Sequence, residues 1–221
     1  MTHFAAVTPA PDHGDRTPIV LASGSPYRAR LLADAGYEAE VDPPDVDERS
    51  LDEGFARLGP EGHALDLARR KAHAVAPRHP GRPVVAADQV GVLDGDGGAP
   101  VMLTKQPTAE GAVAQLLALS GTTHRLVNGV VVIGPDGSEA AGVDVQGGTM
   151  RTGGVDEARA YVERFRPFDT AGSYRLEDQD GMPDGLGFVS SVRGEDPSGV
   201  VGLPIPLLRR LLAEVSPPSA G

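Results

Sequence analysis

Short apolar runs alternate with helical patterns along the first third of the chain. The runs Ile19 to Ala22 and Pro83 to Ala87 are apolar and β-prone, so both are predicted to be buried strands. Between them, apolar residues from about Glu61 to Ala76 recur with the period of a helix. This order of elements predicts an α/β fold.

A tight loop is expected to join the first strand to a helix. The segment 23–25, Ser-Gly-Ser, supplies a turn, and Ser25 is predicted to cap a helix that begins at Pro26. Gly36 follows this helix where a C-cap belongs. Arg28 falls on the apolar stripe of the helix, so a cation shares the face that should turn inward.

Two further charged residues interrupt apolar patterns. Lys71 falls on the apolar face of the helix 61–76, and Asp88 directly follows the strand 83–87, at its predicted carboxyl end. Clefts of α/β proteins open at such strand ends. Each residue also has an ordinary structural interpretation, because a Lys at the edge of a stripe extends to solvent and an Asp after a strand caps a turn. The pattern leaves both interpretations open.

The segment 42–49 concentrates acidic residues in a loop, because Pro43 and Pro44 exclude a helix there. Its carboxylates either bind a cation or face solvent. The chain's six His residues show no metal-ligand spacing, and His124 is expected to be a structural hydrogen-bonding residue.

The rest of the chain predicts further strands and helices of a mixed sheet. A hairpin turn, Pro-Asp-Gly at 135–137, lies between two predicted strands. The predicted elements are a helix at 108–119, strands at 124–133 and 138–149, a helix at 155–164, short strands at 171–176 and 186–192, and a helix at 204–213.

Composition narrows the classes of function. The chain has 31 acidic and 20 basic residues, which argues against a nucleic-acid binder, so any phosphate site must be local. The absence of Cys excludes thiol nucleophiles and thiolate metal sites. Without an apolar run of membrane length, the expectation is a cytoplasmic protein. Residues 1–17 are expected to be a flexible leader, 18–214 a single domain and 215–221 a flexible tail.

Together these features suggest chemistry on a phosphorylated substrate. A strand-to-helix loop can offer backbone N–H groups and a helix dipole to a phosphate, and two inward cations could complete the site. A pair of carboxylates could hold a divalent metal and activate water for phosphoanhydride hydrolysis. The loop lacks the Gly-Lys-Ser/Thr ending of a Walker P-loop, which argues against an NTPase motor.

Eight segments, in chain order and spanning about residues 19 to 214, resemble the Maf nucleotide pyrophosphatases. They are LASGSPYRARLL (21–32), VDER (46–49), LARRKA (67–72), VVAADQVGVLDG (84–95), LTKQP (103–107), LSGTTH (119–124), AGSYRLE (171–177) and VVGLP (200–204).

This resemblance implies a fold and an activity. The implied fold is an elongated mixed β-sheet with flanking helices in two lobes around a cleft, like the inosine triphosphate pyrophosphatases, often as a homodimer. The implied reaction is hydrolysis of a nucleoside triphosphate to the monophosphate and pyrophosphate with a divalent cation, Mg²⁺, Mn²⁺ or Co²⁺. The implied partner is a small-molecule nucleotide, with no nucleic acid or membrane.

The resemblance also implies roles for individual residues. Asp88 matches the family's proposed general base, and Glu48 matches an acidic position that would hold the metal together with Asp88. Lys71 and Lys105 match basic positions that neutralise the triphosphate, although Gln106 follows Lys105 where the family usually has Pro. The phosphate-binding loop and helix start contain Ser23, Ser25 and Arg28.

Three positions that sort the family by nucleotide are Tyr27, Gln89 and Glu177 here. Gln89 and Glu177 match the subgroup acting on 7-methyl-GTP, and Tyr27 keeps an aromatic ring where that subgroup has Trp. An aromatic face and a carboxylate suit a methylated, positively charged guanine. The alternatives are a dTTP/UTP pyrophosphatase of the same family and a nucleotide-binding regulator of septum formation without turnover.

Overall fold

The computed structural model describes residues 18–46, 54–95, 98–175, 187–194 and 196–215. The predicted leader, most of the predicted tail, and residues 47–53 and 176–186 lie outside the described residues.

The described strands form one seven-stranded sheet of mixed direction in the order β2-β1-β3-β5-β6-β7, with β4 paired to β3. The strand β1 is parallel to β2 and β3, whereas β4 is antiparallel to β3 and β7 is antiparallel to β6. The strands are β1 (Ile19–Leu21), β2 (Ala39–Val41), β3 (Val84–Leu93), β4 (Val101–Leu103), β5 (Thr123–Ile133), β6 (Glu139–Met150) and β7 (Val189–Arg193).

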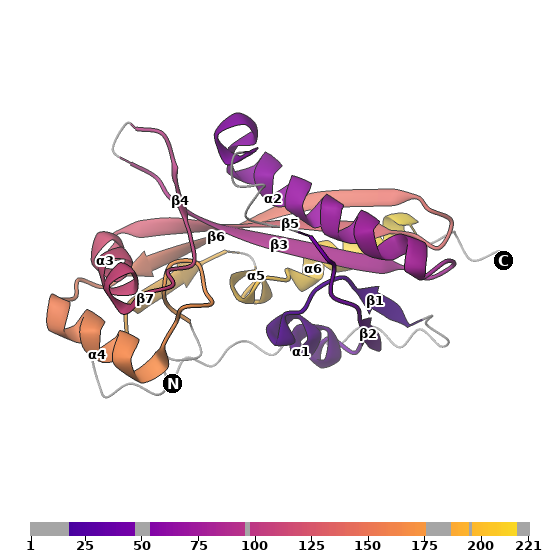
Figure 1. The fold of residues 1–221 in the computed structure, drawn as a ribbon. Helices are drawn as coiled ribbons and strands as arrows, with labels where there is room; N and C mark the ends of the chain where they lie inside the picture. Colours follow the sequence, from indigo (N-terminus) through magenta and orange to yellow (C-terminus); the bar gives the residue numbers. More distant parts are fainter. Residues whose placement is uncertain (1–17, 47–53, 96–97, 176–186, 195, 216–221) are drawn as a thin grey trace. The chain divides into compact units, whose positions relative to one another are not determined.

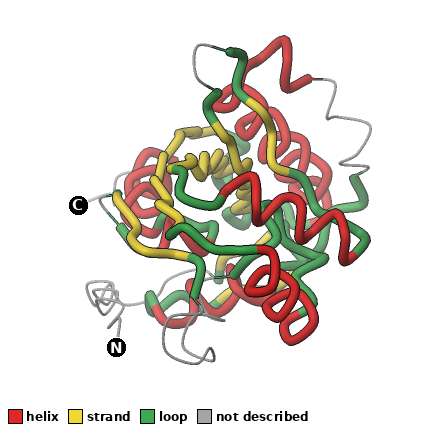
Figure 2. Tube along the Cα trace, turned by 90° about the vertical axis from the view of Figure 1, so that its left-hand side faces the viewer, coloured by secondary structure: helices red, strands yellow, loops and turns green. Residues whose placement is uncertain are grey.

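Helices flank this sheet, so the predicted α/β class with a mixed sheet is confirmed (Figures 1 and 2). Figure 2 shows the helices in red and the strands in yellow. The helices are α1 (Pro26–Asp34), α2 (Gly54–Val75), the 3₁₀ turn η2 (Ala76–Arg78), α3 (Ala109–Leu119), α4 (Val155–Phe165), α5 (Ser198–Val201) and α6 (Ile205–Val215).

The described chain divides into two compact units. Unit 1 contains residues 90–126 and 145–194, and unit 2 contains residues 18–89, 127–144 and 196–215. Because β3, β5 and β6 contribute residues to both, the boundary falls within strands, between Gln89 and Val90 in the case of β3.

Unit 2 has apolar cores on both faces of its part of the sheet. Leu21, Val85 and Val130 face α1 and α6, whereas Val84 and Val131 face α2. Neighbouring residues therefore alternate between the two cores, as the pleat of a strand requires. Figure 1 shows α2 above the sheet and α1 below it.

The helix α2 lies unusually close to β5. A Cβ atom added to Gly129 would lie 2.4 Å from the backbone carbon and oxygen of Ala64, a distance that no side chain tolerates. Glycine at this position thus allows the helix to pack directly on the strand.

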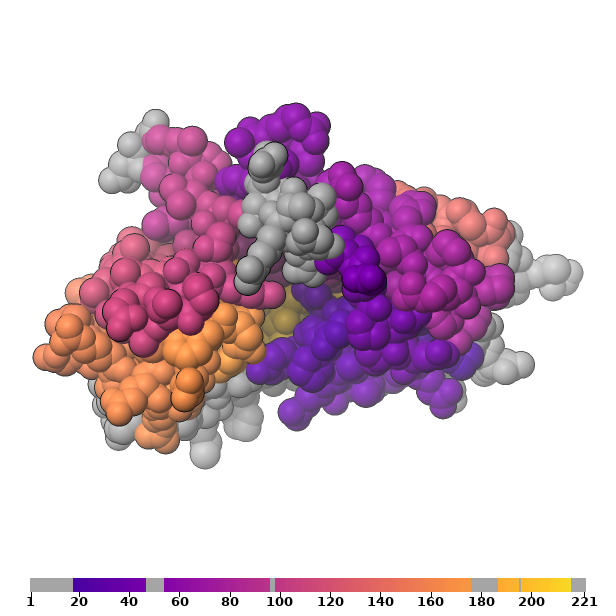
Figure 3. Space-filling view, viewed as in Figure 1, coloured from indigo at the N-terminus to yellow at the C-terminus, as the bar shows by residue number. Residues whose placement is uncertain are grey.

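Unit 1 has its own core, into which α3 and α4 pack. Tyr161 and Phe188 are fully buried there, with their rings edge to face and their centroids 5.5 Å apart. In Figure 3 the pink surface of α3 adjoins the orange surface of α4.

The strand-loop-helix at 19–35 and the hairpin at 135–137 are confirmed. The predicted end of the strand at Ala87 is wrong, because β3 continues to Leu93 and Asp88 lies within it. The helix predicted from about Glu61 corresponds to the part of α2 that follows a kink at Gly59, and the helical turn before the kink, at 54–58, was not predicted.

The C-terminal part differs from the prediction at two points. The segment 171–175 is not a strand, because its only sheet-like pairing is a single bridge between Ala171 and Lys105. The short helix α5 was not predicted.

Candidate active site

A buried ion pair joins α2 to β3 in unit 2. The Lys71 ammonium donates to Asp88 Oδ1 over 2.5 Å, and the two side chains are only 6% and 11% exposed. Asp88 shares the pleat face of Val84 and Ala86, which is the face that packs against α2. Lys71 therefore does not extend to solvent, and the interpretation of Asp88 as a turn cap is wrong.

The geometry leaves the second carboxylate oxygen of Asp88 available. Among the described residues, none makes a hydrogen bond to Asp88 Oδ2. A charge-assisted hydrogen bond at Oδ1 holds the carboxylate in one orientation. Such a fixed carboxylate can accept a proton from water or bind a cation through Oδ2.

The loop after β1 and the start of α1 form a small hydrogen-bond network. Ser25 caps α1 by accepting a hydrogen bond from the Arg28 backbone N–H over 3.4 Å, and Pro26 begins the helix as predicted. The Arg28 guanidinium donates to Ser23 Oγ (3.2 Å) and to the Gly202 carbonyl (2.9 Å). The predicted phosphate-binding residues are thus brought together at a helix N-terminus, which attracts anions.

Gln89 belongs to a second polar network, on the opposite face of the sheet from Asp88. Its Nε2 donates to Asn128 Oδ1 and to two carbonyls of α5, at Gly199 and Val200, over 3.0–3.1 Å. Sequence reasoning missed Asn128, which is fully buried and interrupts the apolar run 126–133 of β5. That isolated amide in an apolar run was the signal that could have found it.

Gly202 lies between the two networks of this face. Its φ of 107° is in the left-handed region. A Cβ atom there would lie 3.6 Å from Arg28 Nε and 3.8 Å from Gln89 Nε2, so a side chain would enter the space between them. The segment around α5 therefore positions both predicted site residues.

The remaining predicted site residues are Lys105, Tyr27, Glu48 and Glu177. Lys105 belongs to unit 1, where it is exposed and pairs with Ala171. Tyr27 is 38% exposed on α1. Glu48 and Glu177 lie outside the described residues.

His124, in unit 1, has the structural role that was expected. Its Nε2 shares a 2.6 Å hydrogen bond with the hydroxyl of Tyr174, and both rings are buried. Burial lowers the pKa of His124 from 6.5 to about 4 and raises the pKa of Tyr174. Both side chains are therefore neutral at pH 7.

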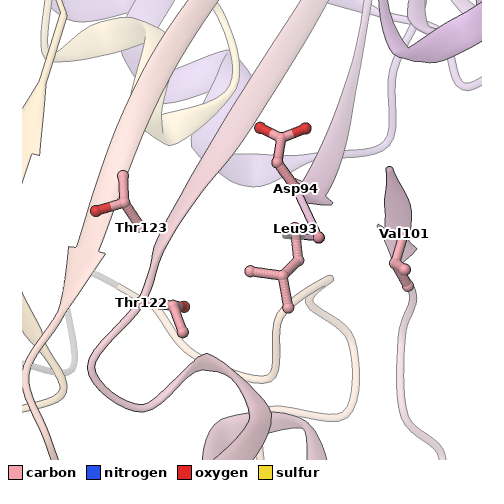
Figure 4. A pocket seen from close by; sticks show the side chains of 6 residues that line it. Leu93, Asp94, Val101, Thr122 and Thr123 are labelled. Atoms are coloured by element: carbon pink, nitrogen blue, oxygen red, sulfur yellow. The ribbon is translucent and has the colours of Figure 1, made fainter. Parts of the chain in front are cut away.

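A separate hollow of about 440 Å³ lies in unit 1, and none of the predicted site residues lines it. Figure 4 shows Leu93 and Asp94 at the end of β3, with Thr122 and Thr123 on one side and Val101 on the other. Asp94 makes two 2.8 Å bonds with the Arg125 guanidinium, so its charge is already paired.

Asp88 is a candidate ligand for the expected divalent cation. Asp88 is a carboxylate with one available oxygen, and no group of three His, Cys, Asp or Glu residues that could hold a metal occurs in the described part of the chain. Mg²⁺ is commonly held by one or two carboxylates together with substrate phosphates, so Asp88 fits such a site.

No described helix has the length and apolar character to cross a membrane.

The fold and these residues define an α/β protein with an anion-attracting helix start and a buried Lys–Asp pair. Residues 18–215 match the family model described as "Maf-like protein". The protein belongs to the Maf family, as its sequence motifs indicated.

Similar proteins carry pyrophosphatase names. A protein of Nitrosococcus oceani named 7-methyl-GTP pyrophosphatase is 36% identical over 204 residues, covering 90% of this chain and 94% of its own length. A protein of Corynebacterium diphtheriae named nucleoside triphosphate pyrophosphatase is 34% identical, covering 88% and 92%. The structure of the Staphylococcus aureus Ham1 protein aligns with a TM-score of 0.40 and 18% identity, over 75% of this chain and 91% of that one.

Proposed function

We propose that this protein hydrolyses 7-methyl-GTP to 7-methyl-GMP and pyrophosphate. Its membership of the Maf family makes it a nucleoside triphosphate pyrophosphatase, a hydrolase. The choice of nucleotide is supported by the 36% identity to a protein named 7-methyl-GTP pyrophosphatase over 90% of this chain.

The observation that carries the proposal is the buried Lys71–Asp88 pair. In the proposed reaction, Asp88 Oδ2 takes the proton of the water that attacks the α-phosphorus. Lys71 holds the carboxylate in place through Oδ1 and adds positive charge near the reacting phosphates. A protein that only binds nucleotides would gain nothing from burying a carboxylate in this orientation, which argues against the regulator without turnover.

The triphosphate is proposed to bind at the loop of Ser23 and Ser25 and the start of α1. Arg28 is held there by its bonds to Ser23 and to the Gly202 carbonyl, so its guanidinium group has a fixed orientation. Lys105 is proposed to neutralise the triphosphate as well.

For the base, we assign Tyr27, Gln89 and Glu177. Tyr27 is exposed and can stack on a cationic purine, and Gln89 is held in place by Asn128 and α5. Glu177 is proposed to accept hydrogen bonds from guanine N1–H and the 2-amino group.

A divalent cation completes the proposed site. Asp88 and Glu48 would hold it, and when bound it would neutralise phosphate charge in the transition state. The protein is further proposed to act on free nucleotides as a homodimer in the cytoplasm, without nucleic-acid or membrane partners.

The products of the reaction test this proposal. Purified protein is incubated with 7-methyl-GTP and Mg²⁺, Mn²⁺ or Co²⁺ in turn, and the products are separated by anion-exchange chromatography. The expected products are 7-methyl-GMP and pyrophosphate in equal amounts, and none in the presence of excess chelator. Release of orthophosphate with 7-methyl-GDP would refute the proposed bond cleavage.

A further inference from the structure

A row of polar side chains crosses unit 2 on the sheet face that packs against α1 and α6. The row consists of Gln89 on β3, Asn128 on β5 and Asp144 on β6. Their neighbours on the same pleat face, among them Ala87 and Val130, belong to the apolar core. Because little else on this face is polar, the hydrogen bonds within the row determine how its side chains are oriented.

Asp144 fixes the orientation of Asn128. The Asn128 Nδ2 donates to Asp144 Oδ2 over 3.2 Å and to the Gly199 carbonyl over 2.8 Å. An ionised carboxylate and a carbonyl can only accept hydrogen bonds, so the amide nitrogen must face them. The Asn128 Oδ1 consequently points the other way, toward Gln89.

Asn128 and α5 in turn fix the orientation of Gln89. The Gln89 Nε2 lies 3.1 Å from Asn128 Oδ1, 3.0 Å from the Gly199 carbonyl and 3.1 Å from the Val200 carbonyl. A flipped amide would place its oxygen against three acceptors and lose every one of these bonds. Within the described part of the chain, the Gln89 Oε1 makes no hydrogen bond.

We infer that Asp144 and Asn128 are positioning residues that make Gln89 present an oxygen, and not an N–H group, to the bound base. The inference rests on the proposed function, in which Gln89 contacts the base. An acceptor selects bases with an N–H donor at the facing edge. The guanine 2-amino group has two N–H donors, of which Glu177 is proposed to take one, whereas adenine has no amino group at this position. This row of Asp144, Asn128 and Gln89, called the relay below, therefore favours guanine over adenine.

The variant Asp144→Asn tests the inference with little change in shape. An amide at 144 can donate as well as accept, so the orientations of Asn128 and Gln89 are no longer imposed. Dissociation constants for GMP and AMP are measured by titration calorimetry. The preference for GMP over AMP is expected to shrink about five- to tenfold, the value of one misdirected hydrogen bond, while kcat for 7-methyl-GTP changes less than about twofold.

The variant Asp66→Asn is the matched control, since it removes the same charge from the same unit at a partly exposed helical position paired with Arg70. It should keep the preference of the unmodified protein. A second variant, Asn128→Ala, removes the middle of the relay and should also lose the preference, with circular dichroism to establish that it folds.

An unchanged preference in Asp144→Asn, or an equal weakening of both nucleotides, would overturn the inference. These outcomes are separable from failure of the proposed function. If the protein releases no pyrophosphate yet binds GMP more tightly than AMP through this relay, the function fails and the inference stands. If the protein hydrolyses 7-methyl-GTP but Asp144→Asn does not change the preference for GMP over AMP, the proposed function stands and the inference fails.

Discussion

Lys71 and Asp88 are each costly to bury alone, so they depend on one another. Both side chains are almost completely removed from solvent, and a single 2.5 Å hydrogen bond joins them. Replacing Lys71 leaves the Asp88 carboxylate as an uncompensated buried charge. The stability of unit 2 and the proposed proton transfer to Asp88 therefore depend on the same ion pair.

Lys71→Met is expected to lower the free energy of unfolding by about 3 kcal/mol, because the Asp88 carboxylate remains buried without its cation. The double variant Lys71→Met/Asp88→Asn should recover much of this loss, since neither charge remains. Urea unfolding followed by circular dichroism measures both. A double variant no more stable than Lys71→Met would contradict the account of the pair.

Asp88→Asn is expected to lower kcat at least about a hundredfold, because an amide cannot take the proton of the attacking water. The amide is of equal size, so KM should change little. Steady-state pyrophosphate release measures both constants, with Asp66→Asn as the charge-matched control on the outward side of α2. Full activity of Asp88→Asn would remove Asp88 from the proposed mechanism.

At the scale of elements, the approach of α2 to β5 at Gly129 sets where Lys71 lies. Gly129→Ala is expected to destabilise the protein by about 3 kcal/mol, because the added methyl would meet the α2 backbone at 2.4 Å and the helix would have to move. Pyrophosphatase activity should fall with it, as Lys71 shifts from Asp88.

The control is Gly98→Ala, at a position where an added Cβ has nothing within 4 Å. This variant should unfold at the same urea concentration as the unmodified protein. Equal stability of Gly129→Ala and Gly98→Ala would show that the helix position does not depend on Gly129.

The strand β3 shows what the sequence could predict and where it could not. The apolar run predicted the strand, but the polar pair Asp88 and Gln89 resembled its end. In the structure each of the two finds a partner on its own face of the sheet, Lys71 on one and Asn128 on the other, so the strand continues to Leu93.

The helix α2 was predicted only in the part that follows its kink. The helical turn before the kink was missed, and the kink lies at Gly59, whose φ of 69° and ψ of 174° only glycine adopts readily. Candidate residues could be chosen from local patterns, but the pairing of Lys71 with Asp88 and the acceptors around Gln89 depend on tertiary contacts that no local pattern contains.

At the scale of the whole molecule, acid is expected to weaken the fold through His124. Burial holds the pKa of this imidazole at about 4, against 6.5 in an unfolded chain, and His124 Nδ1 has no hydrogen-bond partner among the described residues. Between these values the unfolded state binds more protons, so stability is complete above pH 6.5 and falls as the pH drops toward 4.

The free energy of unfolding is expected to fall by about 3 kcal/mol between pH 6.5 and pH 4. Urea unfolding between pH 7.5 and 4.5 measures it, and His124→Gln should show a shallower dependence because its side chain does not titrate. An identical pH dependence in the variant would assign the effect to other groups.

The proposed activity is the central claim, and a comparison of kcat/KM between nucleotides tests it most directly. Pyrophosphate release is followed for 7-methyl-GTP, GTP, dTTP, UTP and ITP, each with Mg²⁺, Mn²⁺ or Co²⁺. The account predicts the highest kcat/KM for 7-methyl-GTP. A higher kcat/KM for dTTP or UTP would contradict the roles given to Tyr27, Gln89 and Glu177, and no release from any nucleotide with any metal would contradict the account as a whole.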